Sequence, residues 1–138
     1  MTLTDEELYE GFSKEQIERY NKEVDEKYGP GTVEATRERL GKLSKKQWQE
    51  VKEEGGAIAL EMAELMYLPP EASEVQKLVK RHHAWIENFW TPNAESYKGL
   101  GRGYVENPEF REFYDKYKKG LAEFLYKAME YYADSQLE

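Results

Sequence analysis

The chain has 138 residues, which suits one domain, and its 28 acidic residues against 20 lysines and arginines give a formal net charge of -8. It contains no cysteine, which excludes disulfides, thiolate metal sites and cysteine nucleophiles. The acidic balance argues against a nucleic-acid-binding surface, and no apolar run reaches the length of a membrane span. We therefore expect a cytoplasmic domain that makes no direct contact with DNA and none with a membrane.

Aromatic side chains are concentrated in the second half of the chain. They make up 14% of a sequence whose mean hydropathy is only -0.94, and 13 of the 19 lie between His82 and Glu138. The first 56 residues instead hold 24 of the 48 charged side chains. We therefore predict a single domain over residues 1–138, with a polar segment at 1–43 and an aromatic-rich core at 44–138.

Capping boxes and helix breakers divide the first part of the chain into helices. A T-x-x-E box at residues 4–7 predicts a short helix, and an S-x-x-Q box at 13–16 predicts another. The second carries one apolar stripe over residues 17–28 and ends at a Gly-Pro-Gly break. A further short helix is predicted over residues 33–40.

The middle of the chain predicts two longer helices. One starts at the S-x-x-Q box of residues 44–47 and is stopped by Pro69-Pro70, while Gly55-Gly56 inside it marks either a kink or a close helix crossing. The other opens at Ser73 and carries one broad apolar face as far as Phe89.

The last third predicts three more helix starts. Asn93 is a suitable N-cap, Asn107-Pro108 is a good N-cap and N1 pair, and Gly120 kinks or divides the chain before a final apolar helix. No segment shows sustained period-two alternation, so strands are not expected. The predicted fold is an all-α bundle of about seven helices around one core.

His82 and His83 are the only histidines. Adjacent helical residues point about 100° apart, and the Glu-x-x-His spacing of a di-iron bundle is absent, so a metal site is not expected. A haem ligand at His82 is a remote alternative. We interpret His82 as a hydrogen-bonded core or pocket histidine and His83 as solvated, and we expect no cofactor.

No pattern in the chain indicates catalysis. Residues 99–103 superficially resemble a phosphate-binding loop, but no strand is predicted before them, so we expect their glycines to permit close helix packing or to line a cavity. Glu61 and Glu64 share a helix face and are interpreted as solvated, and no Ser-His-Asp order is present. We expect a protein that is not an enzyme.

A group of aromatic residues stands out as a candidate ligand-binding set. Tryptophan and tyrosine bring a polar group that needs a partner, and several of them near a helix end and a glycine-rich segment suit a cleft for a large, partly aromatic ligand. An aromatic-rich core is the alternative that composition favours. The candidate ligand-binding residues are His82, Trp85, Phe89, Trp90, Tyr97 and Tyr104.

The second half of the chain resembles a known family. The runs are Y-K-G-L at residues 97–100, Y-V-E-N-P-E-F at 104–110, Y-D at 114–115 and G-L-A-E-F-L at 120–125. Together with the helix from His82 to Trp90, they resemble the TipAS family. Its members are antibiotic-recognition domains of certain MerR-type transcription activators, and some are free-standing proteins.

The resemblance implies a globin-like, all-α fold without haem that binds bulky drugs in a cleft. Some members of the family attach thiopeptide antibiotics through a cysteine that would fall near Pro92-Asn93, and this chain has none. Covalent capture is thereby excluded and reversible binding is expected. Full-length regulators also carry a winged helix-turn-helix and a dimerising coiled coil, for which 138 residues leave no room, so we expect the ligand domain alone.

Residue patterns and resemblance together lead to one expected function. A drug-like small molecule is expected to stack on Trp85, Trp90, Tyr97 and Tyr104, with His82 as a polar contact. The polar segment before residue 43 is expected to close over the cleft as a lid. The domain then serves multidrug recognition in transcription regulation, or sequesters drugs. The alternative is a helical protein–protein interaction domain with no small-molecule ligand, and homodimerisation is left open.

Overall fold

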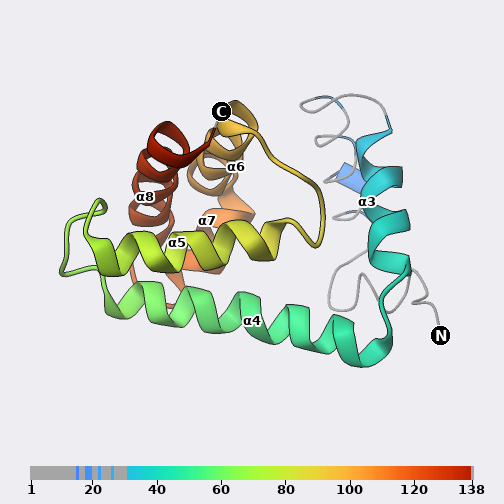
Figure 1. Ribbon diagram of the computed structural model, residues 1–138, viewed down its shortest axis with the longest axis horizontal. Coiled ribbons are helices and arrows are strands. Elements are labelled where there is room, and N and C mark those ends of the chain that lie inside the picture. Colours follow the sequence, from blue (N-terminus) through green and yellow to red (C-terminus); the bar gives the residue numbers. More distant parts are fainter. Residues whose placement is uncertain (1–14, 16–17, 20–21, 23–25, 27–30, 138) are drawn as a thin grey trace. The chain divides into compact units, whose positions relative to one another are not determined.

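The computed structural model describes residues 15, 18, 19, 22, 26 and 31–137. Within this described part there are six helices and no strand: α3 (Thr32–Gly41), α4 (Lys45–Glu64), α5 (Ser73–Ile86), α6 (Ala94–Glu106), α7 (Pro108–Asp115) and α8 (Leu121–Gln136) (Figure 1). The all-α prediction is confirmed there, whereas the globin-like arrangement and the total of about seven helices stay predictions. The two capping boxes before residue 17, and nearly all of the apolar stripe that follows them, lie outside the described residues.

The chain forms two compact units. The first comprises residues 1–52 and 88–90, and the second comprises residues 53–87 and 91–138. In the first unit, the ring of Trp48 packs edge-on against Phe89, with ring centroids 6.4 Å apart and an interplanar angle of 81°. The Nζ of Lys52 lies 5.8 Å from the centroid of the Trp48 ring.

Helix α4 begins at the predicted capping box. The N–H of Gln47 donates to Ser44 Oγ at 3.1 Å, and the N–H of Ser44 donates to Gln47 Oε1 at 2.8 Å. The helix continues through Gly55-Gly56, where the first glycine marks a close crossing: a Cβ on Gly55 would lie 2.7 Å from Cζ2 of Trp85. Of the two alternatives drawn from the sequence, the structure therefore supports the crossing.

Helix α5 begins at Ser73, as the sequence predicted, but without a side-chain cap. Its N-cap is Ala72, which makes no side-chain hydrogen bond to the helix. The amide Nε2 of Gln76 donates instead to the carbonyl oxygens of Pro70 at 2.8 Å and Ala128 at 3.1 Å. Gln76 thus ties the turn before α5 to helix α8, which adds a tertiary contact that a local motif does not predict.

Helix α5 also ends earlier than its apolar periodicity predicted. It stops at Ile86, so the prediction that Phe89 continues the helical face of Trp85 is wrong. The physical reason is tertiary, because Phe89 packs against Trp48 in the first unit. Phe89 therefore keeps the spacing of the helical face but lies in the turn that follows α5.

The three later helix starts follow their predicted caps. Asn93 and Ser96 form a capping box at α6, and the Asn107 side chain accepts backbone N–H groups in the first turn of α7, where Pro108 is the first residue. Gly120 has φ +90°, a conformation that a residue with a Cβ rarely adopts, and it divides α7 from α8.

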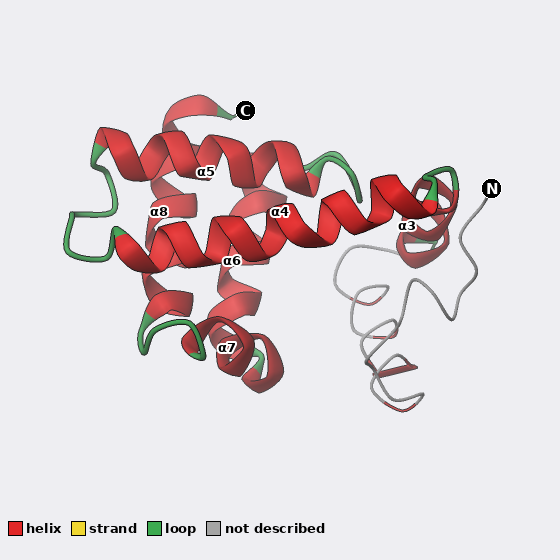
Figure 2. Ribbon diagram, turned by 90° about the horizontal axis from the view of Figure 1, so that it is seen from below, coloured by secondary structure: helices red, strands yellow, loops and turns green. Residues whose placement is uncertain are grey.

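The core of the second unit lies between two layers of helices. Helices α6 and α8 pack against each other and run across the neighbouring pair α4 and α5, with α7 packed on both α6 and α8 (Figures 1 and 2). The glycine run of residues 99–103 lies inside α6, and a Cβ on Gly101 would lie 2.9 Å from Cδ1 of Tyr126 on α8. The expected close packing is confirmed at this position. Fully buried side chains of this core include Met62, Val75, Val79, Leu121, Leu125 and Met129.

Candidate functional site

His82 is the centre of a buried cluster of hydrogen-bonded rings. Its side chain is 1% exposed, its Nδ1 lies 2.7 Å from Tyr97 Oη, and its Nε2 lies 3.3 Å from Tyr104 Oη. A neutral imidazole has one donor and one acceptor nitrogen, so one tyrosine hydroxyl donates to the ring and the other accepts from it. We call His82, Tyr97 and Tyr104 the histidine cluster, and its members pair with one another inside the core.

Helical spacing explains why these residues meet. On α5 the buried positions Val75, Leu78, Val79, His82 and Ile86 recur every three or four residues and form one stripe. On α6, Tyr97 and Tyr104 are seven residues apart, which places both on the same face. The packing of these two faces brings the two hydroxyls to opposite nitrogens of one ring.

The histidine cluster is electrically neutral. Burial, with a smaller contribution from neighbouring His83, lowers the pKa of His82 to about 3. Burial also raises the pKa of Tyr97 well above its ordinary value, and Tyr132 and Tyr114 add to that shift. Both directions favour the uncharged forms, so the cluster presents neutral hydrogen-bonding groups near pH 7.

Trp85 connects the histidine cluster with the surface. Its ring centroid lies 5.7 Å from that of His82, and the residue is partly exposed. The absence of a side chain at Gly55 lets the indole approach α4 closely. Trp85 is thus the predicted site residue that both touches the histidine cluster and reaches solvent.

The structure brings together four of the six predicted site residues, namely His82, Trp85, Tyr97 and Tyr104. Phe89 and Trp90 belong to the first compact unit, and both are partly buried there.

Sequence reasoning missed two tyrosines that extend the cluster. Tyr114 on α7 packs on Tyr104 with ring centroids 4.7 Å apart, and Tyr132 on α8 packs on Tyr97 at 6.0 Å. Both are buried. Tyr132 continues the apolar stripe of Leu125, Ala128 and Met129 along α8, which predicts its burial but not its contact with Tyr97.

His83 was expected to be solvated, and this expectation is wrong. Its side chain is 16% exposed and lies between Tyr97 and Tyr132, with ring centroids 5.3 and 5.6 Å away. Its Nδ1 lies 3.5 Å from Glu87 Oε1, while its Nε2 is buried without a hydrogen-bond partner among the described residues. The aromatic residues of α6 and α8 cover a position that the stripe of α5 alone leaves outside the core.

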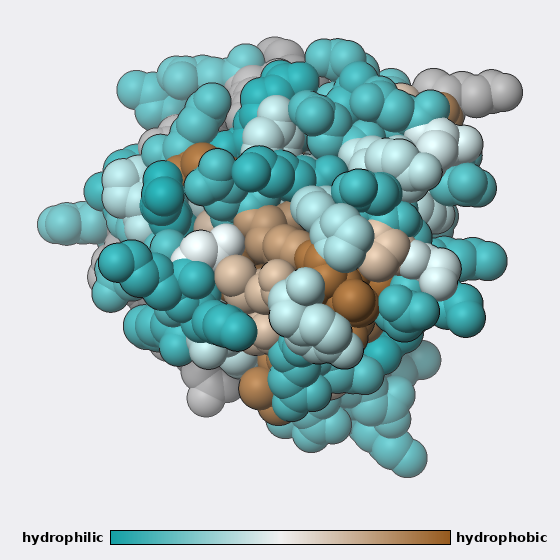
Figure 3. All heavy atoms as spheres, turned by 90° about the vertical axis from the view of Figure 1, so that its left-hand side faces the viewer, coloured by the Kyte–Doolittle hydropathy of each residue, from teal (hydrophilic) through white to brown (hydrophobic). Residues whose placement is uncertain are grey.

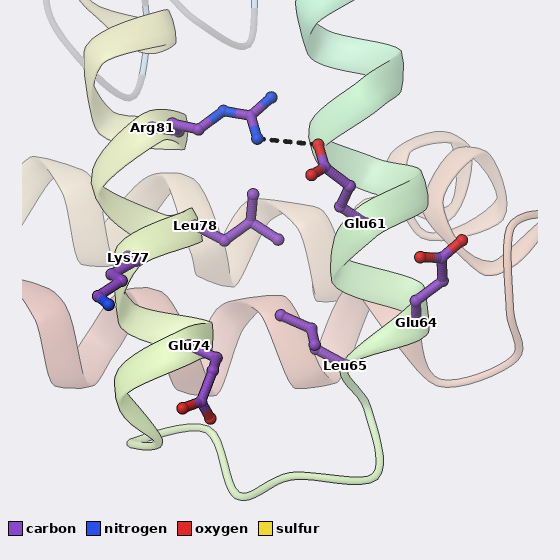
Figure 4. A pocket seen from close by; sticks show the side chains of 7 residues that line it. All are labelled: Glu61, Glu64, Leu65, Glu74, Lys77, Leu78 and Arg81. Carbon is purple, nitrogen blue, oxygen red and sulfur yellow. Dashed lines mark hydrogen bonds and ion pairs between the residues drawn. The ribbon is translucent and has the colours of Figure 1, made fainter.

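A groove lies apart from the histidine cluster, where α4 and α5 run side by side. In Figure 4, the side chains of Leu65 and Leu78 point toward each other across it, and Arg81 reaches from α5 to Glu61 on α4. The guanidinium also pairs with Glu54 at 2.7 Å, and these carboxylates raise the pKa of Arg81. The groove encloses about 270 Å³ and is lined by Glu61, Glu64, Leu65, Glu74, Lys77, Leu78 and Arg81.

This groove has different chemistry from the predicted site. It contains none of the six candidate ligand residues, and its charged rim already pairs internally through Arg81. Figure 3, which faces the turn between α4 and α5, shows apolar atoms gathered within a polar surround. Leu65, Met66 and Leu68 of that turn are partly exposed.

The described residues contain no group of three or more histidine, aspartate or glutamate side chains that could hold a metal ion. No helix in the described part of the chain is long and apolar enough to cross a membrane.

Over the residues that the structure describes, fold and site together define a helical domain whose buried rings surround the hydrogen-bonded His82. The model of the TipAS antibiotic-recognition domain matches residues 20–132, which is most of the chain. The chain therefore belongs to the TipAS family, and the resemblance seen in the sequence is confirmed.

Relatives of the chain are transcription factors. It is 34% identical over 142 residues to the HTH-type transcriptional regulator SkgA of Caulobacter vibrioides, and this match covers 96% of the chain and 54% of SkgA. It is 29% identical to the HTH-type transcriptional activator mta of Bacillus subtilis, covering 98% of the chain and 54% of the relative. The HTH-type transcriptional activator TipA of Streptomyces coelicolor is 26% identical to the chain, and this match covers 94% of the chain and 53% of TipA.

The chain thus spans about half the length of these curated relatives. No solved structure matches the chain significantly.

Proposed function

We propose that the chain reversibly binds bulky, hydrophobic, antibiotic-like molecules. In this proposal it acts as the sensor domain of a MerR-type transcription regulator or as a free-standing protein that sequesters drugs. Two findings support the idea: membership of a family described by antibiotic recognition, and matches to HTH-type regulators over nearly the whole chain.

The observation that carries the proposal is the position of Trp85 against the histidine cluster. A ligand that stacks on the partly exposed indole and displaces it gains access to the ring of His82 and to two tyrosine hydroxyls. Aromatic contact provides apolar burial, and a few placed polar groups orient the ligand. Because the cluster is neutral, no charge has to be desolvated when such a ligand enters.

The absence of cysteine defines the chemistry of capture. With no thiol to add to a ligand, the complex is held by apolar contact and hydrogen bonds, so it dissociates on dilution. Mass spectrometry of the protein after dialysis against ligand-free buffer should return the unmodified mass.

Isothermal titration calorimetry with a thiopeptide, and separately with the planar aromatic cation ethidium, tests the proposal. We expect saturable heat with at least one compound, and an affinity that falls by about tenfold or more in Trp85→Ala. Tyr131→Ala is the matched control, because this aromatic side chain of α8 is 49% exposed and belongs neither to the histidine cluster nor to the predicted site, and it should leave the affinity within about twofold. If neither compound gives heat or shifts the melting temperature, the proposal fails, and the interaction-domain alternative takes its place.

A further inference from the structure

Exposed aromatic and lysine side chains gather where α7 turns toward α8. Phe113 is 49% exposed and Tyr117 is 39% exposed, and Lys116, Lys118 and Lys119 are all exposed. We call these five residues the basic turn. None of them belongs to the histidine cluster or to the residues proposed to bind a drug.

The backbone of the basic turn is fixed at both ends. Gly120 adopts φ +90°, and the N–H of Leu121 donates to the carbonyl of Lys118 at 3.0 Å. On the other side, Asp115 Oδ1 accepts the N–H of Ala122 at 3.1 Å, which ties the end of α7 to the start of α8. A surface that is ordered before binding loses little conformational entropy when a partner arrives.

The exposed rings rest on a buried aromatic base. Phe113 packs edge-on against Tyr114 with centroids 5.1 Å apart, and against Tyr117 at 6.0 Å. Tyr114 is 7% exposed and is itself packed on Tyr104. Since the core beneath is already filled by Tyr114, the two outer rings remain at the surface.

The apolar part of this surface continues onto α4. The hydroxyl oxygen of Tyr117 lies 3.7 Å from the position that a Cβ on Gly56 would take. Leu60 stands one helical turn further along the same face of α4 and is 53% exposed. The lysines of the basic turn therefore lie beside aromatic and aliphatic groups that are open to solvent.

The lysines of the basic turn differ from Lys98 and Lys127 of the same unit, which lie beside carboxylates. Lys98 pairs with Asp134 at 2.8 Å, and Lys127 lies 3.7 Å from Glu123. By contrast, the described residues place no carboxylate within 4.0 Å of Lys116, Lys118 or Lys119. In a chain with a net charge of -8, this is a local excess of positive charge.

We propose that the basic turn docks an acidic, amphipathic segment of a partner protein. The ammonium groups complement aspartate and glutamate, while Phe113, Tyr117 and Leu60 receive the apolar side chains of that segment. The surface is small, so the interaction is weak, transient and sensitive to salt.

A nucleic acid fits this surface less well than an acidic peptide. Three lysines within four residues are few for a site whose affinity depends on neutralising a row of phosphates. The α4 side, at Gly56 and Leu60, offers apolar contact and no side-chain donor to phosphate.

Fluorescence anisotropy with a labelled peptide tests the proposal. The probe is a synthetic peptide of about 14 residues in which leucine and phenylalanine recur at helical spacing between aspartates and glutamates. At about 50 mM salt we expect saturable binding to the whole chain, and at least about a tenfold loss in about 0.5 M salt.

Two pairs of variants locate the binding surface. Lys118→Glu with Lys119→Glu should weaken binding at least about tenfold, whereas Lys77→Glu with Lys80→Glu, an equal change of charge at exposed positions of α5, should change it less than about twofold. Phe113→Ser should weaken binding in the same way, and Tyr131→Ser is its control because both side chains are 49% exposed. Circular dichroism verifies that each variant keeps its helices.

Four results would overturn the proposal. The first is no binding of the peptide at about 1 mM, and the second is an equal loss of peptide affinity in a variant and its control. The third is tighter binding of an oligothymidine of similar length, and the fourth is self-association that the Lys118 and Lys119 changes abolish. The last would assign the surface to a second copy of the chain. None of these results bears on drug binding at Trp85, which the calorimetry measures separately.

Discussion

The second unit contains two groups of aromatic residues, the histidine cluster and the basic turn, whose surroundings are opposite although Tyr114 packs both on Tyr104 of the first and on Phe113 of the second. In the histidine cluster, every ring is buried, neutral and paired with another member. In the basic turn, the rings of Phe113 and Tyr117 face solvent among lysines. Aromatic content alone therefore does not identify a binding surface, because the partners of the polar groups and the local charge decide what each ring can contact.

Truncating one ring in each group should give the largest contrast. Tyr97→Ala removes a fully buried ring and leaves His82 Nδ1 without its partner, so we expect a loss of about 3–5 kcal/mol in the free energy of unfolding. Phe113→Ala should cost about 1 kcal/mol or less, because half of that side chain is already in water. Urea unfolding followed by circular dichroism measures both, and comparable losses would contradict the distinction.

Acid should act on the histidine cluster and not on the basic turn. The folded pKa of His82 is about 3 and its ordinary value is 6.5, so between these values the unfolded chain binds a proton that the folded chain does not. His82 therefore stabilises the fold above pH 6.5, and this contribution falls by about 1.4 kcal/mol per pH unit as the pH drops toward 3.

Unfolding free energies measured from pH 7 to pH 4 test this linkage. In His82→Gln the unfolding free energy should depend less steeply on pH, because the contribution of this histidine is gone. In Phe113→Ala the pH dependence should be the same as in the wild type. Parallel curves for wild type and His82→Gln would show that the imidazole is not held neutral by its burial.

The sequence predicted the fold where local interactions decide it. The caps at Ser44, Asn93 and Asn107 depend on side chains within three residues of the helix start, and the structure confirms each of them. The end of α5 depends instead on the packing of Phe89 against Trp48, which lies 41 positions earlier in the sequence. Apolar periodicity contains no information about such a contact.

The candidate site shows the same division between local and tertiary information. The stripe of α5 was enough to predict a buried, hydrogen-bonded His82, and the structure confirms it. Its partners Tyr97 and Tyr104 are 15 and 22 residues away, so the pairing follows only from how helices meet. The covering of His83 by Tyr132 was missed for the same reason.

Alanine substitutions at the adjacent glycines of α4 should have opposite effects on stability, because Gly55 lies against Trp85 and Gly56 lies near Tyr117. A Cβ on Gly55 would lie 2.7 Å from the indole of Trp85, so Gly55→Ala should destabilise the fold by about 1–2 kcal/mol despite the gain in helix propensity. Gly56→Ala meets only the Tyr117 hydroxyl at 3.7 Å, an ordinary contact, and should stabilise α4 by about 0.5–1 kcal/mol.

Thermal unfolding and tryptophan emission together distinguish these outcomes. Only the Gly55 variant should shift the emission of Trp85, because only that substitution moves the indole. Equal melting temperatures and unchanged spectra for both variants would contradict the close crossing of α4 by Trp85.

The smallest expected effect concerns Lys119, which precedes α8. Lys119 stands just before the N-cap Gly120, at the positive end of the helix dipole, where a cation is unfavourable and an anion favourable. Lys119→Glu should therefore raise the free energy of unfolding by about 0.3–0.5 kcal/mol. Lys127→Glu, in the middle of α8, should instead lower it by a similar amount because it replaces an i, i+4 attraction to Glu123 with repulsion. Suppose that chemical unfolding shows the Lys119 variant to be more stable while the acidic peptide binds it more weakly. Lys119 then lowers the stability of the fold and strengthens peptide binding, which is expected of a residue that serves a contact surface.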